Sequence, residues 1–241
     1  LLVLAWALTW TPDRPALGHF RLLALDVGQG SAVLVQTRHH ALLHDTGPAW
    51  GAAGDAGARV VVPTLKALGV APDRVVVSHR DSDHAGGAEA VRAAHPQARW
   101  LSSFSANASE RCVAGQRWQW DGVDFEVLHP QPDDYAEDGT GRLSSNAMSC
   151  VLRVSNGTHS AWLAGDLDAA RALLAYSFSQ DAPPADQLTA RLVQARLFEL
   201  DGQSDRALAV YTAIGRAPLD AVAVPAKLGV VRLSLAKGTM K

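Results

Sequence analysis

The sequence is poor in cysteine and carries no excess of charge of either sign. Only Cys112 and Cys150 occur among 241 residues, without a Cys-x-x-Cys pair, which excludes a thiolate zinc knuckle. We favour two buried small residues; the other interpretation is a disulfide, which would imply an oxidising compartment. The formal net charge of −2 lacks the global basic excess typical of nucleic-acid binders. A hydrolase can still hold a phosphodiester with metals and a few arginines.

The sequence also lacks a long hydrophobic run. The apolar segment Leu1–Leu8 ends by Trp10, far short of the about 20 residues that a membrane span needs. No basic stretch precedes it, which argues against a signal peptide. We interpret it as the end of a membrane helix that starts outside this sequence, or as a buried N-terminal strand or helix.

Hydrophobic periodicity predicts a mixed order of strands and few helices up to residue 166. Expected strands cover 20–25, 32–36, 41–44 and 74–78, expected helices cover 60–68 and 87–94, and expected hairpins cover 118–128 and 150–163, with turns at Asp121-Gly122 and Asn156-Gly157. This order favours an αββα sandwich of the α/β (α+β) class over a doubly wound sheet.

Beyond residue 168 the pattern becomes helical. Amphipathic helices are predicted at about 168–178, 185–200, 204–215 and 219–236. Pro184 and Pro218 are 34 residues apart, as are Ala195 and Gly229, a period typical of tetratricopeptide repeats. The alternative is an ordinary helical tail with similar alanine spacing.

The strongest local signal lies between an apolar strand and the helix predicted at 87–94. The segment Ser78-His79-Arg80-Asp81-Ser82-Asp83-His84-Ala85-Gly86-Gly87 holds two histidines and two aspartates within six residues. In a loop, His79 and Asp81 can point to one position while Asp83 and His84 reach a second, and such ligands suit Zn²⁺ or Mn²⁺. The two glycines permit a tight turn into the helix. A solvated polar loop is the plain alternative.

Further polar residues stand at predicted strand ends and turns. Asp166 ends the strand 161–166 and could bridge two metals, or cap a helix. Asp26 and Asp45 are followed by glycines; they either form turns only or support the metal loop by hydrogen bonds. His39, His40 and His44 flank a hairpin and are expected in turns or at the surface.

These motifs resemble the metallo-β-lactamase domain of ComEC-type competence proteins, the DNA-uptake channels of the bacterial inner membrane. Aspartate at position 81, where most metallo-β-lactamase relatives have histidine, is typical of that family. The matching segments keep the same order and spacing: Leu25–Gly30, Asp45–Gly47, His79–Gly87, Asn146–Leu152 and Gly165–Asp166. The resemblance covers residues 18–168 as an incomplete sandwich, between a membrane-helix end or linker at 1–17 and the tetratricopeptide-like segment at 169–241.

The resemblance implies a metal-dependent nuclease with two divalent ions, Zn or Mn. It implies that Asp81 or Asp83 acts as the catalytic proton acceptor. It maps the metal ligands onto His79, Asp81, Asp83, His84 and Asp166, and the supporting residues onto Asp26, Asp45, Asn146 and Ser149. The implied substrate is a single DNA strand that is not imported. The implied location is the periplasmic side of the bacterial inner membrane, with membrane attachment through a preceding region and a protein partner for the helical tail.

Two departures from the family pattern predict an enzyme with weakened activity. Ser31 stands where the family usually has aspartate, and no histidine follows Asp166, where the family has a late His-His-Gly-Ser segment. The chain therefore looks like two pieces joined by gene fusion or by sequence assembly. The alternatives are a protein-binding helical-repeat module attached to a non-catalytic remnant, and a hydrolase for a small ester or lactam.

Overall fold

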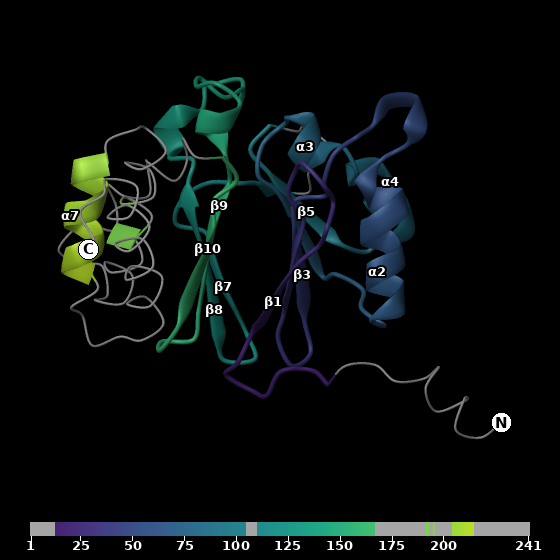
Figure 1. Ribbon diagram of the computed structural model, residues 1–241. Helices are drawn as coiled ribbons and strands as arrows, with labels where there is room; N and C mark the ends of the chain where they lie inside the picture. The colour runs from purple at the N-terminus through teal and green to yellow at the C-terminus, as the bar shows by residue number, and fades with distance from the viewer. Residues whose placement is uncertain (1–12, 105–109, 167–190, 193–194, 196–203, 215–241) are drawn as a thin grey trace, which may run out of the picture. The chain divides into compact units, whose positions relative to one another are not determined.

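The structure of the chain, a computed structural model, describes residues 13–104, 110–166, 191–192, 195 and 204–214. The chain divides into two compact units near Asp166, and residues 158–160 group with the second unit. The first unit carries both β-sheets (Figure 1). Among the described residues, no helix has the length and apolar character to cross a membrane.

The first sheet has six strands in sequence order. Strands β1 to β3 are antiparallel, and β3 to β6 are parallel to one another. Parallel pairing brings the carboxyl ends of β3, β4 and β5 to one edge of the sheet, where loop residues can converge. The strands are β1 (Arg21–Ala24), β2 (Val33–Gln36), β3 (Ala41–His44), β4 (Arg74–Val77), β5 (Arg99–Ser102) and β6 (Glu110–Arg111).

The second sheet is antiparallel, in the order β10-β9-β8-β7. The predicted turn at Asp121-Gly122 is confirmed: both residues have positive φ, 54° and 80°, as a two-residue hairpin turn requires. The predicted hairpin around Asn156-Gly157 is confirmed as well. The strands are β7 (Arg117–Trp120), β8 (Val123–His129), β9 (Val151–Ser155) and β10 (Ser160–Leu163).

Strand β4 shows why the first sheet is buried on both faces. Val76 packs into the core between the two sheets, with Phe125 and Leu152 from the second sheet. Val75 and Val77 point the other way and pack under the helices, against Leu65 and other apolar residues. The alternation of side chains along a strand makes a continuous valine run the natural sequence for such a position.

Three helical segments accompany the first sheet. The outer face is covered by η2, a π-helical turn (Gly57–Val61), together with α2 (Val62–Ala67) and α4 (Ala88–Ala94), as Figure 1 shows. The helix predicted over 60–68 therefore starts earlier and opens with a π turn. Short 3-10 turns are η1 (Gly51–Ala53), η3 (Pro132–Asp134) and η4 (Asn146–Met148).

The helix predicted at 204–215 is confirmed as α7 (Ser204–Ile214). It buries Ala207, Tyr211 and Ile214 in a small cluster with Ala195. The other three predicted tail helices lie largely or wholly outside the described residues, and so does the apolar segment Leu1–Leu8. The tetratricopeptide interpretation of 169–241 therefore stays a prediction.

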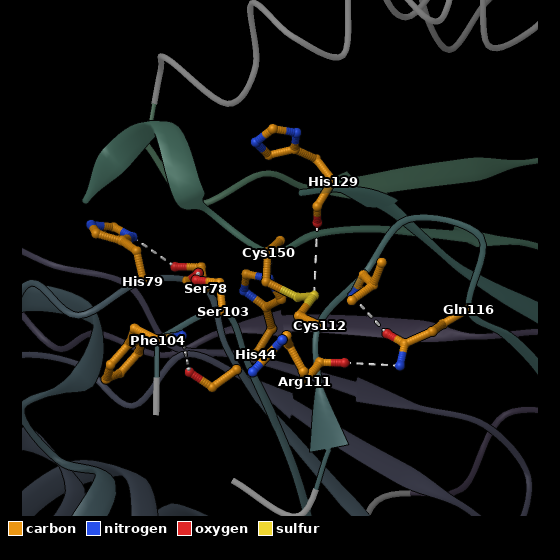
Figure 2. Close-up of a disulfide and its surroundings, with 12 residues drawn as sticks. His44, Ser78, His79, Ser103, Phe104, Arg111, Cys112, Gln116, His129 and Cys150 are labelled. Carbon is orange, nitrogen blue, oxygen red and sulfur yellow. Dashed lines mark hydrogen bonds between the residues drawn. A yellow bond between two sulfur atoms is a disulfide. The ribbon is translucent and has the colours of Figure 1, made fainter. Parts of the chain in front are cut away.

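A disulfide joins the two sheets. Cys112 follows β6 and Cys150 precedes β9; both are buried, and their Cα atoms are 5.9 Å apart (Figure 2). The interpretation favoured from the sequence, two unlinked buried cysteines, was wrong. The amide of Cys112 donates to the carbonyl of Ser102 in β5, which brings Cys112 to the edge where the second sheet meets the first.

Candidate metal centre

The site is built at the carboxyl ends of β3 and β4. Asp45 follows β3, and its amide donates to the carbonyl of Val76 at 2.8 Å. His79 stands two residues past β4, and Asp166 lies three residues past β10 of the other sheet. The site therefore sits where the loops of both sheets meet.

A single helical turn presents the other candidate ligands. Residues Ser82–Ala85 form α3, with Asp81 in extended conformation as its N-cap. The sequence predicted a loop over the whole segment, and the turn corrects this. The turn is closed by a hydrogen bond from the amide of His84 to the carbonyl of Asp81. It holds Asp83 and His84 on consecutive positions beside Asp81.

Asp166 lies between the two histidines. One of its carboxylate oxygens is 3.0 Å from Nε2 of His84, and the other is 3.7 Å from Nε2 of His79. Nε2 of His79 is also 3.6 Å from Asp81, and Nε2 of His84 is 3.7 Å from Asp83. Both imidazoles therefore turn the same ring nitrogen toward a set of carboxylates.

These residues fit a divalent metal. Nε2 of His79 is buried and has no hydrogen-bond partner, an arrangement that is costly unless something else occupies that position. Two groups have ligand atoms within 4.8 Å of one another: His79 with Asp81 and Asp166, and His79 with Asp83 and His84. The three carboxylates are 31% to 43% exposed, so the groups open toward solvent.

Asp45 orients His84 from behind. Its carboxylate is 2.8 Å from Nδ1 of His84, and it accepts hydrogen bonds from the amide and hydroxyl of Ser78 at 2.7 and 3.1 Å. Nδ1 of His44 lies 3.4 Å away on the same carboxylate. Asp45 is fully buried at a φ of 61°, a left-handed conformation that aspartate adopts more readily than most residues.

The surroundings shift the pKa values of the two histidines in opposite directions. Burial would raise the pKa of Asp45, but His44 and His84 outweigh it and hold that pKa well below its usual range. Burial acts against the charged form of His84, yet the hydrogen bond and charge of Asp45 raise its pKa. Burial, with the neighbouring His84, lowers the pKa of His79 and so favours the neutral imidazole, the form that binds a metal.

The candidate supporting residues divide into two groups. Asp45 lies in the site as described, and the hydroxyl of Ser149 is 3.3 Å from Nδ1 of His79. Asn146 is in η4, where its carbonyl accepts from the amide of Ser149; no contact of its side chain with the site is found among the described residues. Asp26 is exposed and accepts from the amide of Gly28, so its role is in the turn.

Backbone contacts replace the expected support from Asp26. The amide of Ser31 donates to the carbonyl of Asp83 at 3.0 Å. A Cβ on Gly30 would lie 2.4 Å from that same carbonyl oxygen, so only glycine allows the approach. The turn after β1 therefore holds α3 through main-chain atoms.

Gly86 and Gly87 act by close packing, not by the tight turn expected from the sequence. Their φ values are −61° and −90°, which any residue adopts. A Cβ on Gly86 would lie 2.1 Å from the amide nitrogen of Ala49, and one on Gly87 would lie 2.4 Å from that of Gly57. The pair lets α3 and α4 pack directly against the loop that follows β3.

Sequence reasoning missed several buried polar residues. His44, expected in a turn or at the surface, is 1% exposed; its place at the end of a buried strand beside Asp45 was the available signal. Ser78 is fully buried, and its hydroxyl lies 3.0 Å from Nδ1 of His79 and 3.3 Å from Nδ1 of His84. His129 is also buried, with Nε2 2.7 Å from the carbonyl of Ala147.

Comparison with known proteins places this geometry in a family. A sequence profile of the metallo-beta-lactamase superfamily matches residues 25–191. The chain belongs to the metallo-beta-lactamase superfamily. Its mixed α/β sheets with few helices have the fold class expected from the sequence.

Three curated relatives cover the same part of the chain. Competence protein ComA of Neisseria gonorrhoeae is 39% identical over 169 residues, 70% of this chain and 23% of that protein. Recombination protein 2 of Haemophilus influenzae is 34% identical over 60% of this chain and 18% of that protein. The uncharacterized protein YcaI of Escherichia coli is 34% identical over 70% and 21%. The chain thus spans about a fifth of each relative.

Solved structures give distant matches. A metallo-beta-lactamase from Cronobacter sakazakii is 17% identical over 98% of this chain and 96% of its own, with a TM-score of 0.46. The subclass B3 enzyme MEM-A1, from a soil metagenome library, is 14% identical over 96% of this chain and 98% of its own, with a TM-score of 0.44.

Proposed function

We propose that this chain is a divalent-metal-dependent phosphodiesterase that acts on DNA, the nuclease domain of a ComEC-type competence protein. One observation carries the proposal: the carboxylate of Asp166 faces the ring nitrogens of both His79 and His84, at 3.7 and 3.0 Å. A carboxylate shared between two imidazoles suits a site with two metals, the arrangement found in many phosphodiester hydrolases.

The donor set divides naturally between two ions. His79 and Asp81 would hold one, Asp83 and His84 the other, and Asp166 would contact both. Two Zn²⁺ or Mn²⁺ ions bound there would supply an acidified water and neutralise charge on the phosphate oxygens. Asp45 fixes the ring of His84, and Ser149 and Ser78 contact the ring of His79.

Asp81 and Asp83 are the candidates for the proton acceptor. Their side chains are 42% and 43% exposed, more than that of Asp166, so each can face solvent and substrate. A carboxylate at the rim of the site can take the proton of the attacking water while the buried histidines stay in place. We assign the catalytic role to one of these two.

The names of the relatives support the proposed substrate, and the disulfide supports the proposed location. The names of two of them refer to competence and recombination, which supports DNA as the substrate. We propose a single strand of it. We propose the periplasmic side of the bacterial inner membrane as the location. The Cys112–Cys150 disulfide supports this, because disulfides persist in oxidising compartments.

Metal content and hydrolysis test the proposal together. Purified protein should bind two equivalents of Mn²⁺ or Zn²⁺ and hydrolyse bis(p-nitrophenyl) phosphate only with metal. Turnover of this chain should be slow, because its residues 167–241 hold no histidine that could complete the family pattern. His79→Ala and Asp166→Ala should abolish both properties, whereas Asp26→Ala, which alters an exposed turn, should retain them. Failure to bind metal, or activity that survives Asp166→Ala, would refute the proposal.

A further inference from the structure

A groove runs away from the metal centre along one side of His79. A small cavity of about 50 Å³ is lined by His79, Arg80, Phe104 and Leu143, among others. A larger cavity of about 270 Å³ continues from it toward Arg111. The two cavities share Arg80, Ser103, Phe104 and Gly141, so they form one continuous depression. Figure 2 labels three of its lining residues, His79, Phe104 and Arg111.

The walls of this groove combine one free cation with exposed apolar groups. Arg80 is exposed, and its guanidinium has no ion pair or hydrogen bond with any residue that the structure describes. Phe104 is 43% exposed and Leu143 is 45% exposed. None of these three is explained by the core or by the candidate ligand set. An unpaired guanidinium beside an exposed ring suits a ligand that has both an anion and a flat apolar surface.

The far end of the groove is electrostatically balanced. The guanidinium of Arg111 lies 4.9 Å from the ring centre of Tyr135 and close to Gly139. The carboxylate of Asp138, which also lines this end, accepts hydrogen bonds from Thr140 and interacts with Arg111. The unpaired positive charge is therefore Arg80, next to His79.

We propose that this groove binds the nucleotides next to the scissile phosphate of a single nucleic-acid strand. Arg80 binds the neighbouring phosphate, and Phe104 stacks on an unpaired base. The inference rests on the proposed function and assigns the residues that hold the strand beside the metal centre. In a duplex the faces of the bases are covered by stacking, so only an unpaired base can reach Phe104. A volume of about 270 Å³ is near the lower end of small-ligand sites, about 300 Å³, which suits one nucleotide unit.

Kinetics on a long and a short substrate test the groove separately from the metals. We expect Arg80→Ala and Phe104→Ala each to raise KM for a labelled single-stranded oligonucleotide about tenfold. Hydrolysis of bis(p-nitrophenyl) phosphate and metal affinity should not change, because that substrate is too short to fill the groove. Phe104→Trp should keep the low KM, whereas Phe104→Leu should lose it. Arg38→Ala, which removes an exposed arginine from a turn, is the charge control.

Binding to metal-free protein makes the test independent of catalysis. Fluorescence anisotropy with single-stranded DNA, single-stranded RNA and the matching duplex should show tighter binding of a single strand, weakened by Arg80→Ala but not by Arg38→Ala. Tight binding of single-stranded DNA, single-stranded RNA or both supports the proposed role of the groove and shows which sugar it accepts. Preference for the duplex, or equal affinity of the wild-type and Arg80→Ala proteins, would overturn the inference. If the protein binds a single strand as expected but hydrolyses none of the substrates, the proposed function is refuted and the inference about the groove is not.

Discussion

The Nδ1 atom of His84 lies 2.8 Å from the carboxylate of Asp45, while Nε2 of the same ring lies 3.0 Å from Asp166. One side of the imidazole thus contacts a fully buried acid, and the other faces the candidate metal positions. A carboxylate behind a histidine fixes which nitrogen carries the proton and leaves the other free to bind a metal.

The first prediction concerns Asp45. Asp45→Asn keeps the size of the side chain, and asparagine tolerates the left-handed backbone at this position. It removes the charge that orients His84, so we expect metal affinity to fall about 10- to 100-fold. Competition against a chelator measures the change, and circular dichroism checks the fold. Asp26→Asn is the matched control, and equal losses in the two variants would contradict the role of Asp45.

Gly165 places Asp166, and its replacement gives a second prediction. Its φ is +60°, and a Cβ there would lie 2.9 Å from both Ser78 and Ser149, the residues behind His79. Gly165→Ala should therefore displace Asp166 and reduce metal affinity at least tenfold, the scale seen when groups that orient ligands are disturbed, about 10- to 100-fold. Isothermal titration with Mn²⁺ measures the effect.

Gly157→Ala separates backbone strain from the clash at Gly165. Gly157 also has a positive φ of +85°, but a Cβ there would meet nothing within 4 Å. The Gly157→Ala protein should therefore lose some stability and keep its metal affinity. If Gly165→Ala binds metal as tightly as Gly157→Ala does, the packing of Gly165 does not position Asp166.

Reduction of the disulfide gives a third prediction. The bond closes a separation of 38 residues, for which the loss of chain entropy corresponds to about 3–4 kcal/mol of unfolding free energy. The amide of Cys150 donates to the carbonyl of Ser78 at 2.7 Å. Reduction of the disulfide should therefore also weaken metal binding severalfold. Denaturant unfolding and metal titration with and without a phosphine reductant measure both effects. The Cys112→Ala/Cys150→Ala variant should not respond to the reductant.

The sequence predicted local features well because they depend on neighbouring residues. The valine run of β4, the Asp121-Gly122 turn and helix α7 all carry period or turn signals within a few positions. The dense motif from His79 to His84 predicted a candidate metal site, and the structure places its histidines and aspartates in groups that could hold an ion.

Features that depend on distant contacts were missed or misjudged. The burial of His44 depends on Asp45 and on the carbonyl of Cys150, which is 106 residues away. The glycines at 86 and 87 are required by main-chain atoms of Ala49 and Gly57, which no local turn pattern reveals. Strand β5 (Arg99–Ser102) was not predicted, because its pairing with β4 decides its conformation.

Asp121 carries the last prediction, which concerns acid stability. Its carboxylate accepts hydrogen bonds from the hydroxyl of Thr37 at 2.6 Å and from the amide of His39 at 2.7 Å, and so ties the β7–β8 turn to the β2–β3 turn. Burial alone would raise its pKa, but these bonds and the charge of His39 lower it. Asp121→Asn, which suits the same positive φ, should cost on the order of 1–3 kcal/mol at pH 7.

The pH dependence of this cost follows from the lowered pKa. Because the folded-state pKa of Asp121 is lower than the unfolded value of 3.8, its contribution is fully present above that value and is lost as the pH falls toward the folded-state pKa. The difference in unfolding free energy between the wild-type and Asp121→Asn proteins should therefore be fully present at about pH 5 and shrink below about pH 4. Urea unfolding at pH 7, 5 and 3 measures it. A difference that grows between pH 5 and pH 3 would show that the carboxylate is not stabilised in its charged form by the β2–β3 turn.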